Sequence, residues 1–193
     1  MIARARFIPA FLIAVLTVLL TGCGSILATF ETDTIEEDPG ERSIAQQVLD
    51  ESIETKSVVN IRAADKAFDN GSFAVVSYNG YVLIAGEVGS LDLKNKASEV
   101  LRKIEGVRRI YNELEVGPNS NTETEANDAW LTTKVKSALL TTSNTPSTRV
   151  KVVTENSVVY LMGLLTPEEA DRVAKTASEI SGIKRVVRLF ELI

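Results

Sequence analysis

The 193-residue sequence contains no histidine and only one cysteine, Cys23. A single cysteine cannot form a disulfide within the chain, and it cannot complete a zinc site of the usual cysteine and histidine type. The lack of histidine also removes the most common general base and the usual catalytic triads. The acids Glu168 and Glu169 lie in the expected first turn of a helix, where the helix dipole stabilises negative charge. We therefore expect a protein that is not an enzyme and that uses no metal or cofactor.

Positive charge is sparse as well. The formal net charge is −5, and residues 31–40 hold five acids and no base. Removal of Arg4 and Arg6 with a cleaved leader would lower the net charge from −5 to −7. Nucleic-acid binding depends on clustered lysines and arginines that neutralise phosphates. The sequence therefore argues against a nucleic acid as partner.

The N-terminus has the pattern of an export signal. Arg4 and Arg6 precede an apolar run over residues 7–20, which is shorter than the roughly 20 residues that a membrane-spanning helix needs. The run ends in Leu20-Thr21-Gly22-Cys23, which resembles the lipobox of bacterial lipoproteins. The resemblance implies a signal peptide over residues 1–22, cleavage after Gly22, and lipidation of Cys23 as the new N-terminus.

The residues after Cys23 favour an outer-membrane location. In lipoproteins of this kind an aspartate after the cysteine is associated with retention in the inner membrane, and here that position is Gly24. The resemblance therefore implies an anchor in the inner leaflet of the outer membrane, with the protein facing the periplasm. Several acyl chains on one residue make such an anchor stable. The acid-rich residues that follow oppose compact packing, so residues 23–40 are expected to be the lipidated N-terminus and a flexible tether.

The rest of the chain contains an internal repeat. Residues 81–88 resemble residues 158–165, and residues 106–110 resemble residues 182–186. The paired glycines are separated by 77 residues (Gly86 and Gly163) and by 76 residues (Gly106 and Gly182). A repeat of this period indicates two copies of one small structural unit. We expect a first module over residues 41–116, a linker over residues 117–125 and a second module over residues 126–193.

Each module has the pattern helix, strand, strand, helix, strand. In the first module Ser43 and Gln46 have the spacing of a capping box, and Ile44, Val48 and Ile53 are expected on the buried side of the first helix. The dipeptide Asn79-Gly80 between two apolar runs predicts a tight β-hairpin. In the second module we expect Asn127 or Asp128 to cap a helix over residues 130–141. A capping box over residues 166–169 starts its second helix, with Pro167 at the first helical position.

These features resemble the BON domain. The resemblance rests on the αββαβ order, on the glycine that ends a strand in each copy (Gly86 and Gly163), and on the corners Gly106–Ile110 and Gly182–Val186. It implies an α+β fold with two tandem modules, each a three-stranded mixed sheet packed against two helices. In lipoproteins with two BON domains the second domain binds anionic phospholipid such as phosphatidylglycerol through its first helix. Such proteins support outer-membrane integrity and are associated with division sites and the outer-membrane assembly machinery.

The first helix of the second module contains a candidate lipid site. On a helical wheel of residues 128–142, Leu131, Val135 and Leu139 form a core-facing stripe. The candidate residues lie outside that stripe, with lysines on both edges: Trp130, Thr133, Lys134, Lys136, Ser137 and Leu140. Tryptophan favours the membrane interface, and each lysine near an anionic leaflet contributes about 1 kcal/mol.

Two alternatives to this assignment remain open. By residue type alone, a lone tryptophan is more often structural, so Trp130 would pack against the first module and the lysines would simply be solvated. The family resemblance favours lipid contact instead. The equivalent helix of the first module is expected to expose Asp50, Glu51 and Glu54, which anionic lipid would repel. Alternatively, both modules form a scaffold for outer-membrane assembly or division-site proteins, and the lipid anchor serves only for placement.

Overall fold

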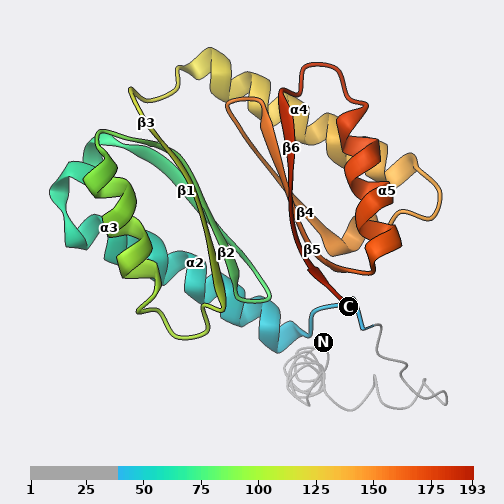
Figure 1. Cartoon of the computed structure of the whole chain (residues 1–193), viewed down its shortest axis with the longest axis horizontal. Helices are drawn as coiled ribbons and strands as arrows, with labels where there is room; N and C mark the ends of the chain where they lie inside the picture. Colours follow the sequence, from blue (N-terminus) through green and yellow to red (C-terminus); the bar gives the residue numbers. More distant parts are fainter. Residues whose placement is uncertain (1–38) are drawn as a thin grey trace, which may run out of the picture. The chain divides into compact units, whose positions relative to one another are not determined.

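The computed structural model describes residues 39–193, which lie in one compact unit of the chain (Figure 1). The predicted signal peptide, Cys23 and the tether up to residue 38 lie outside the described residues. Within the described part, the fold is α+β with two copies of the order helix, strand, strand, helix, strand. This confirms the fold class predicted from the sequence.

The first module consists of α2 and a short 3-10 helix, two strands, a helix and a last strand. The bounds are α2 Ile44–Ala64, η2 Lys66–Asn70, β1 Ser72–Tyr78, β2 Tyr81–Val88, α3 Leu91–Leu101 and β3 Arg109–Val116. Strand β2 lies in the middle of the sheet, antiparallel to β1 and parallel to β3. The sheet is therefore mixed, and β1 and β3 form its edges.

The second module repeats this arrangement. Its bounds are α4 Thr122–Thr141, η3 Ser147–Arg149, β4 Val150–Glu155, β5 Val158–Leu165, α5 Pro167–Ser178 and β6 Arg185–Leu192. Strand β5 is central, antiparallel to β4 and parallel to β6. Helix α4 begins inside the segment 117–125 that we expected to be a linker. Its N-cap is Asn121, whose side chain accepts a hydrogen bond from the backbone of Thr124, so the capping role predicted for Asn127 or Asp128 was wrong.

Local sequence signals explain the turns and helix ends. Asn79 and Gly80 have φ angles of 52° and 75°, the positive values that a tight hairpin between twisted strands requires. The predicted capping box is present at the start of α5, where Thr166 and Glu169 bond to each other's backbone N–H groups. Gly182 has a φ of 101° just after the second helix, a conformation that favours glycine. These short-range predictions are confirmed.

Helix α2 faces the core with a different side from the one we expected. Ile53 is buried, but Ile44 is 81% exposed and Val48 is 64% exposed. The buried side is made by Asp50, Ile53, Ser57 and Ile61. At 100° per residue, Ile44 and Val48 lie roughly opposite that side. The expectation that they belong to the core stripe was therefore wrong.

Asp50 is buried, although we expected it to be exposed. Only 2% of it is accessible, and its carboxylate accepts hydrogen bonds from the backbone N–H groups of Asn79 (2.8 Å) and Gly80 (2.9 Å). Both N–H groups belong to the hairpin turn and point toward α2. A buried backbone donor without an acceptor is costly, so the helix supplies a carboxylate. Arg42 adds an ion pair at 2.7 Å.

Asp128 plays the same part in the second module. Its carboxylate accepts hydrogen bonds from the backbone N–H groups of Asn156 (2.7 Å) and Ser157 (2.8 Å), the two turn residues between β4 and β5. Asp50 and Asp128 are thus equivalent positions that fasten each first helix to its own hairpin. This is a further element of the repeat, which sequence comparison of the strands and glycines did not show.

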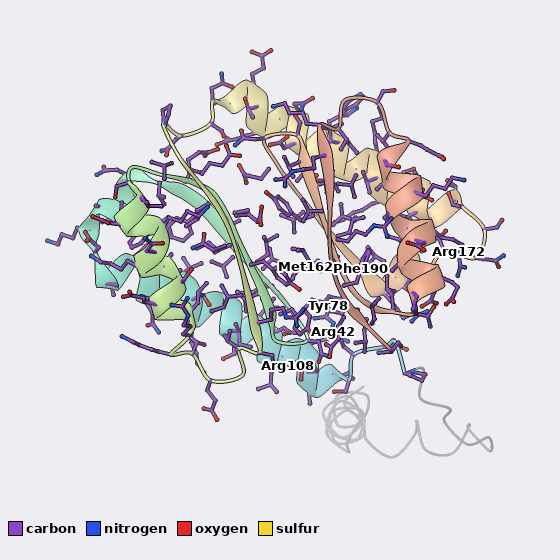
Figure 2. All side chains as sticks on the ribbon, viewed as in Figure 1. Arg42, Tyr78, Arg108, Met162, Arg172 and Phe190 are labelled. Carbon is purple, nitrogen blue, oxygen red and sulfur yellow. The ribbon has the colours of Figure 1, made fainter. Side chains whose placement is uncertain are left out.

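Each sheet has a helical side and a second apolar side. The helices α2 and α3 enclose one core with the first sheet, and α4 and α5 enclose another with the second sheet. The opposite faces of the two sheets share a third apolar cluster, to which Tyr78, Leu83 and Met162 belong (Figure 2). The contact is completed by polar bonds, among them the Tyr78 hydroxyl to the Arg149 carbonyl oxygen at 2.9 Å. The two modules therefore pack sheet against sheet.

Candidate functional site: the outer face of helix α4

Helix α4 separates a fully buried side from an exposed apolar side. Leu131, Val135 and Leu139 are essentially inaccessible because they pack into the core of the second module. Trp130 is 56% exposed and Leu140 is 68% exposed. Trp130 is therefore not sealed beneath the first module. Ten residues at 1.5 Å per residue place the two apolar side chains about 15 Å apart along the helix.

Lys134 lies directly against the exposed indole. Its ammonium nitrogen is 4.1 Å from the centroid of the Trp130 ring, and it donates a hydrogen bond to the Ser181 carbonyl oxygen at 3.4 Å. A cation over the face of an indole is attracted by the ring quadrupole. The contact brings a positive charge to the rim of the aromatic surface. Lys136, on the other edge of the face, is exposed.

Small polar residues occupy the space between the two apolar side chains. Thr133 is exposed, and its hydroxyl donates a hydrogen bond to the carbonyl oxygen of Ala129 at 3.0 Å, one turn earlier in the helix. Ser137 is also exposed. Because the Thr133 hydroxyl is already bonded to the helix, it adds little cost when the face leaves water. We call the six residues Trp130, Thr133, Lys134, Lys136, Ser137 and Leu140 the outer face of α4.

Negative charge near α4 is confined to its N-terminal part. Glu123 and Glu125 lie in the first turn, where they complement the helix dipole, and Asp128 is buried. Glu155 lies at the end of β4, and burial raises its pKa to about 7, with the charges of Glu87 and Asp128 as further causes. Beyond Asp128 the charged residues of α4 are lysines only. This gives the outer face of α4 a positive local charge in an acidic protein.

The equivalent helix α2 of the first module is less acidic on its surface than we expected. Asp50 is buried, and Glu54 accepts a hydrogen bond from Ser77 and pairs with Lys151 at 2.8 Å. Only Glu51 of the three acids remains plainly exposed. The charge argument against lipid contact by the first module is therefore weaker than the sequence suggested. The difference between the helices that remains is that Ser52 takes the place of Trp130.

Two other kinds of site were searched for in the described chain. Among residues 39–193, no three or more histidine, cysteine, aspartate or glutamate residues are grouped so that they could hold a metal ion. No helix in that same range combines the length and apolar character needed to cross a membrane. The exposed face of α4 is therefore amphipathic surface on a folded module.

Sequence comparison defines the class of protein. Residues 50–118 and 127–193 each match the BON domain, and the chain belongs to the BON-domain family. This confirms the resemblance read from the repeat.

Among its relatives is the outer membrane lipoprotein DolP of Haemophilus influenzae, 35% identical over 182 residues, which are 91% of each chain. Another is the 21 kDa hemolysin of Actinobacillus pleuropneumoniae, 34% identical over 152 residues, 79% of this chain and 78% of that one. The osmotically-inducible protein Y of Escherichia coli is 27% identical over 183 residues, 91% of each chain.

Proposed function

We propose that the protein is an outer-membrane lipoprotein that binds anionic phospholipid through the outer face of α4 and supports the integrity of the envelope. Cys23 carries the lipid anchor in the inner leaflet, and the two BON domains face the periplasm. The protein acts by binding and has no catalytic role. The similarity to DolP and the lipobox pattern support the location. The observation that carries the lipid site is the exposure of Trp130 and Leu140 beside Lys134 and Lys136.

The energetics support a weak surface contact that depends on the anchor. Burying the exposed part of Trp130 or of Leu140 contributes about 1–2 kcal/mol each. Two lysines near an anionic leaflet add about 1 kcal/mol each. A total of about 4–6 kcal/mol corresponds to a dissociation constant of about 0.05–1 mM. The acyl chains on Cys23 hold the domain near the bilayer, where such a contact forms as an intramolecular step.

Vesicle flotation of the acyl-free chain, residues 24–193, tests the proposal. The wild-type chain is expected to float with vesicles that contain phosphatidylglycerol and to remain behind with purely zwitterionic vesicles. Trp130→Glu removes the aromatic contact and adds a repelled charge, so it should abolish flotation. The matched control is Val59→Glu, which places the same charge on an exposed apolar position of α2. Normal flotation of Trp130→Glu would remove the site assignment.

A second candidate function rests on an exposed stripe of α2. Ile44, Val48 and Val59 are all exposed, and at 100° per residue they fall within about 60° of one another, away from the core. Such a stripe suits contact with another protein, as in the scaffold for outer-membrane assembly or division-site partners. A photo-crosslinker at Val48 that captures a single envelope protein, together with no flotation of the wild-type chain, would favour this function over lipid binding.

A further inference from the structure

The second sheet ends in a long strand with an open edge. Its strand order is β4-β5-β6, and within residues 39–193 β6 pairs with β5 alone. The outer backbone groups along eight residues of β6 therefore have no strand partner in that range. Such an edge is a template for a further strand, which natural proteins cover or pair.

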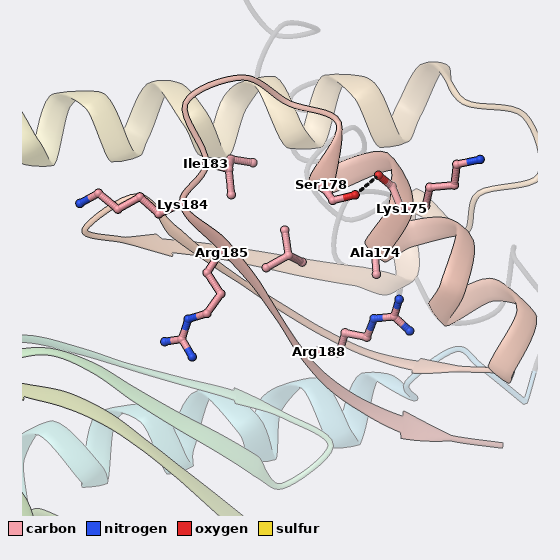
Figure 3. Close-up of a pocket in the computed structure, with 8 residues that line it drawn as sticks. Ala174, Lys175, Ser178, Ile183, Lys184, Arg185 and Arg188 are labelled. Atoms are coloured by element: carbon pink, nitrogen blue, oxygen red, sulfur yellow. Dashed lines mark hydrogen bonds between the residues drawn. The ribbon is translucent and has the colours of Figure 1, made fainter.

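A groove follows this edge between β6 and α5. It consists of two cavities of about 470 Å³ and 270 Å³ that share Arg188 as a lining residue (Figure 3). The helix side of the groove is formed by small residues, Ala170 and Ala174. The strand side is formed by Val186, Arg188 and Phe190. The groove therefore has room beside the strand edge.

The first module shows how the same position is closed. Asn112 of β3 takes the place of Arg188, 76 residues earlier. Its side-chain amide donates hydrogen bonds to the Lys94 carbonyl oxygen (2.6 Å) and to the Ser98 hydroxyl (2.7 Å), which ties β3 to α3. The counterparts of Lys94 and Ser98 are the two alanines of α5. The second module has lost this tie, so the groove is specific to that module.

The lining changes from basic to apolar along the groove. Four cations and no acid line the larger cavity: Lys175, Lys184, Arg185 and Arg188. Arg185 lies 3.7 Å from Glu113, and Arg188 pairs with Asp171 at 2.5 Å. The smaller cavity is mainly apolar, with Pro167, Phe190 and Leu192 around it. An extended segment with acids at one end and an apolar residue at the other would match this lining.

Residues 31–38 of the same chain have that composition. They hold five acids and three β-branched residues, Thr32, Thr34 and Ile35. The described chain begins beside the apolar end of the groove, since a Cβ on Gly40 would lie 3.0 Å from the Leu164 carbonyl oxygen. Leu165, the next residue, accepts a hydrogen bond from the C-terminal Ile193.

The length of the segment also fits. Eight extended residues span about 26 Å, which is the length of an eight-residue strand such as β6. A chain running back from Gly40 along β6 would place Ile35 nearer the apolar cavity and Glu31 and Asp33 nearer the lysines. The geometry points to residues 31–38 as a fourth strand of the second module, parallel to β6, docked in the groove between β6 and α5. This docking shortens the tether between Cys23 and the domains, and it is independent of lipid binding by α4.

Hydrogen exchange of the acyl-free chain, residues 24–193, tests the docking without lipid. In wild type at low salt, the amides of residues 31–38 should exchange at least about tenfold more slowly than in an unstructured peptide. The variant in which all five acids become amides (E31Q, D33N, E36Q, E37Q and D38N) should return to the unstructured rate. A control with five exposed module acids neutralised (E51Q, D92N, E99Q, E105Q and E123Q) should keep the protection.

A groove variant separates this docking from any other protection of the segment. Lys175→Glu combined with Lys184→Glu should abolish the slow exchange, whereas Lys66→Glu combined with Lys103→Glu in the first module should leave it. Exchange of residues 31–38 at the unstructured rate in wild type would overturn the inference. Protection that persists in the groove variant would overturn it as well.

Discussion

Replacing Asp50 with alanine should destabilise the protein far more than an ordinary substitution on a helix surface. The carboxylate is 2% accessible and accepts hydrogen bonds from two turn N–H groups and from the Ser77 hydroxyl at 2.7 Å. Arg42 is its ion-pair partner at 2.7 Å. Alanine leaves all of these donors without an acceptor.

The magnitude follows from the donors that lose their partner. Each buried N–H or O–H group left unsatisfied costs about 1–3 kcal/mol, and loss of one member of a buried ion pair costs about 3–5 kcal/mol. These costs overlap because water enters part of the space, so we expect a loss of about 3–5 kcal/mol in the free energy of unfolding. Urea denaturation at pH 7 measures it. The neighbouring, exposed Glu51→Ala is the control and should change stability by less than about 0.5 kcal/mol.

The pH dependence gives an independent check on the same carboxylate. Burial by itself would raise the pKa of Asp50, but hydrogen bonds from Gly80, Ser77 and Arg42 outweigh it and hold the pKa below the ordinary value of 3.8. The charged form is therefore favoured in the folded protein. Its stabilisation is fully present above the unfolded pKa and is lost as the pH falls through the folded pKa. The stability difference between wild type and Asp50→Asn should shrink below about pH 4. A difference that is constant down to pH 2, or Asp50→Ala as stable as wild type, would refute the reasoning.

Two further predictions concern single positions. Gly86 has a φ of 127°, and a Cβ there would lie 2.2 Å from the Ser72 carbonyl oxygen, so Gly86→Ala should lower the free energy of unfolding by more than about 2 kcal/mol in urea. Gly89→Ala, where a Cβ meets nothing within 4 Å, is its control. Burial, with the charges of Glu87 and Asp128, raises the pKa of Glu155 to about 7, so wild type loses stability as the pH rises from 4.5 toward 7. Glu155→Gln should therefore be about 1 kcal/mol more stable than wild type at pH 8, after allowance for partial exposure, and equally stable at pH 4; a constant difference would contradict this.

Features set by near neighbours could be predicted from the sequence. The Asn79-Gly80 turn and the Thr166–Glu169 capping box depend on residues within four positions, so their patterns are sufficient. The exposure of Trp130 and Leu140 also followed from the sequence, because helical geometry alone places them away from Leu131 and Val135.

Features set by distant partners could not be predicted. Asp50 is buried because its donors lie about 30 residues further along the chain, and an acid on a helix otherwise indicates a solvated surface. Ile44 and Val48 are apolar but face away from the core, which no local periodicity can show when the wrong side of a helix also contains apolar residues. The α5 and β6 groove arises from small side chains, Ala170 and Ala174, and small residues give no distinctive signal.

The fluorescence of Trp130 tests the central claim most directly, since it is the only tryptophan in the chain. On addition of phosphatidylglycerol vesicles to the acyl-free chain at low salt, the emission should shift to shorter wavelength, and quenchers carried on the lipid should reduce it. The shift should reverse with added salt, because the attraction of Lys134 and Lys136 to the leaflet is screened. Emission that stays at the wavelength of an indole in water at saturating lipid would contradict the account.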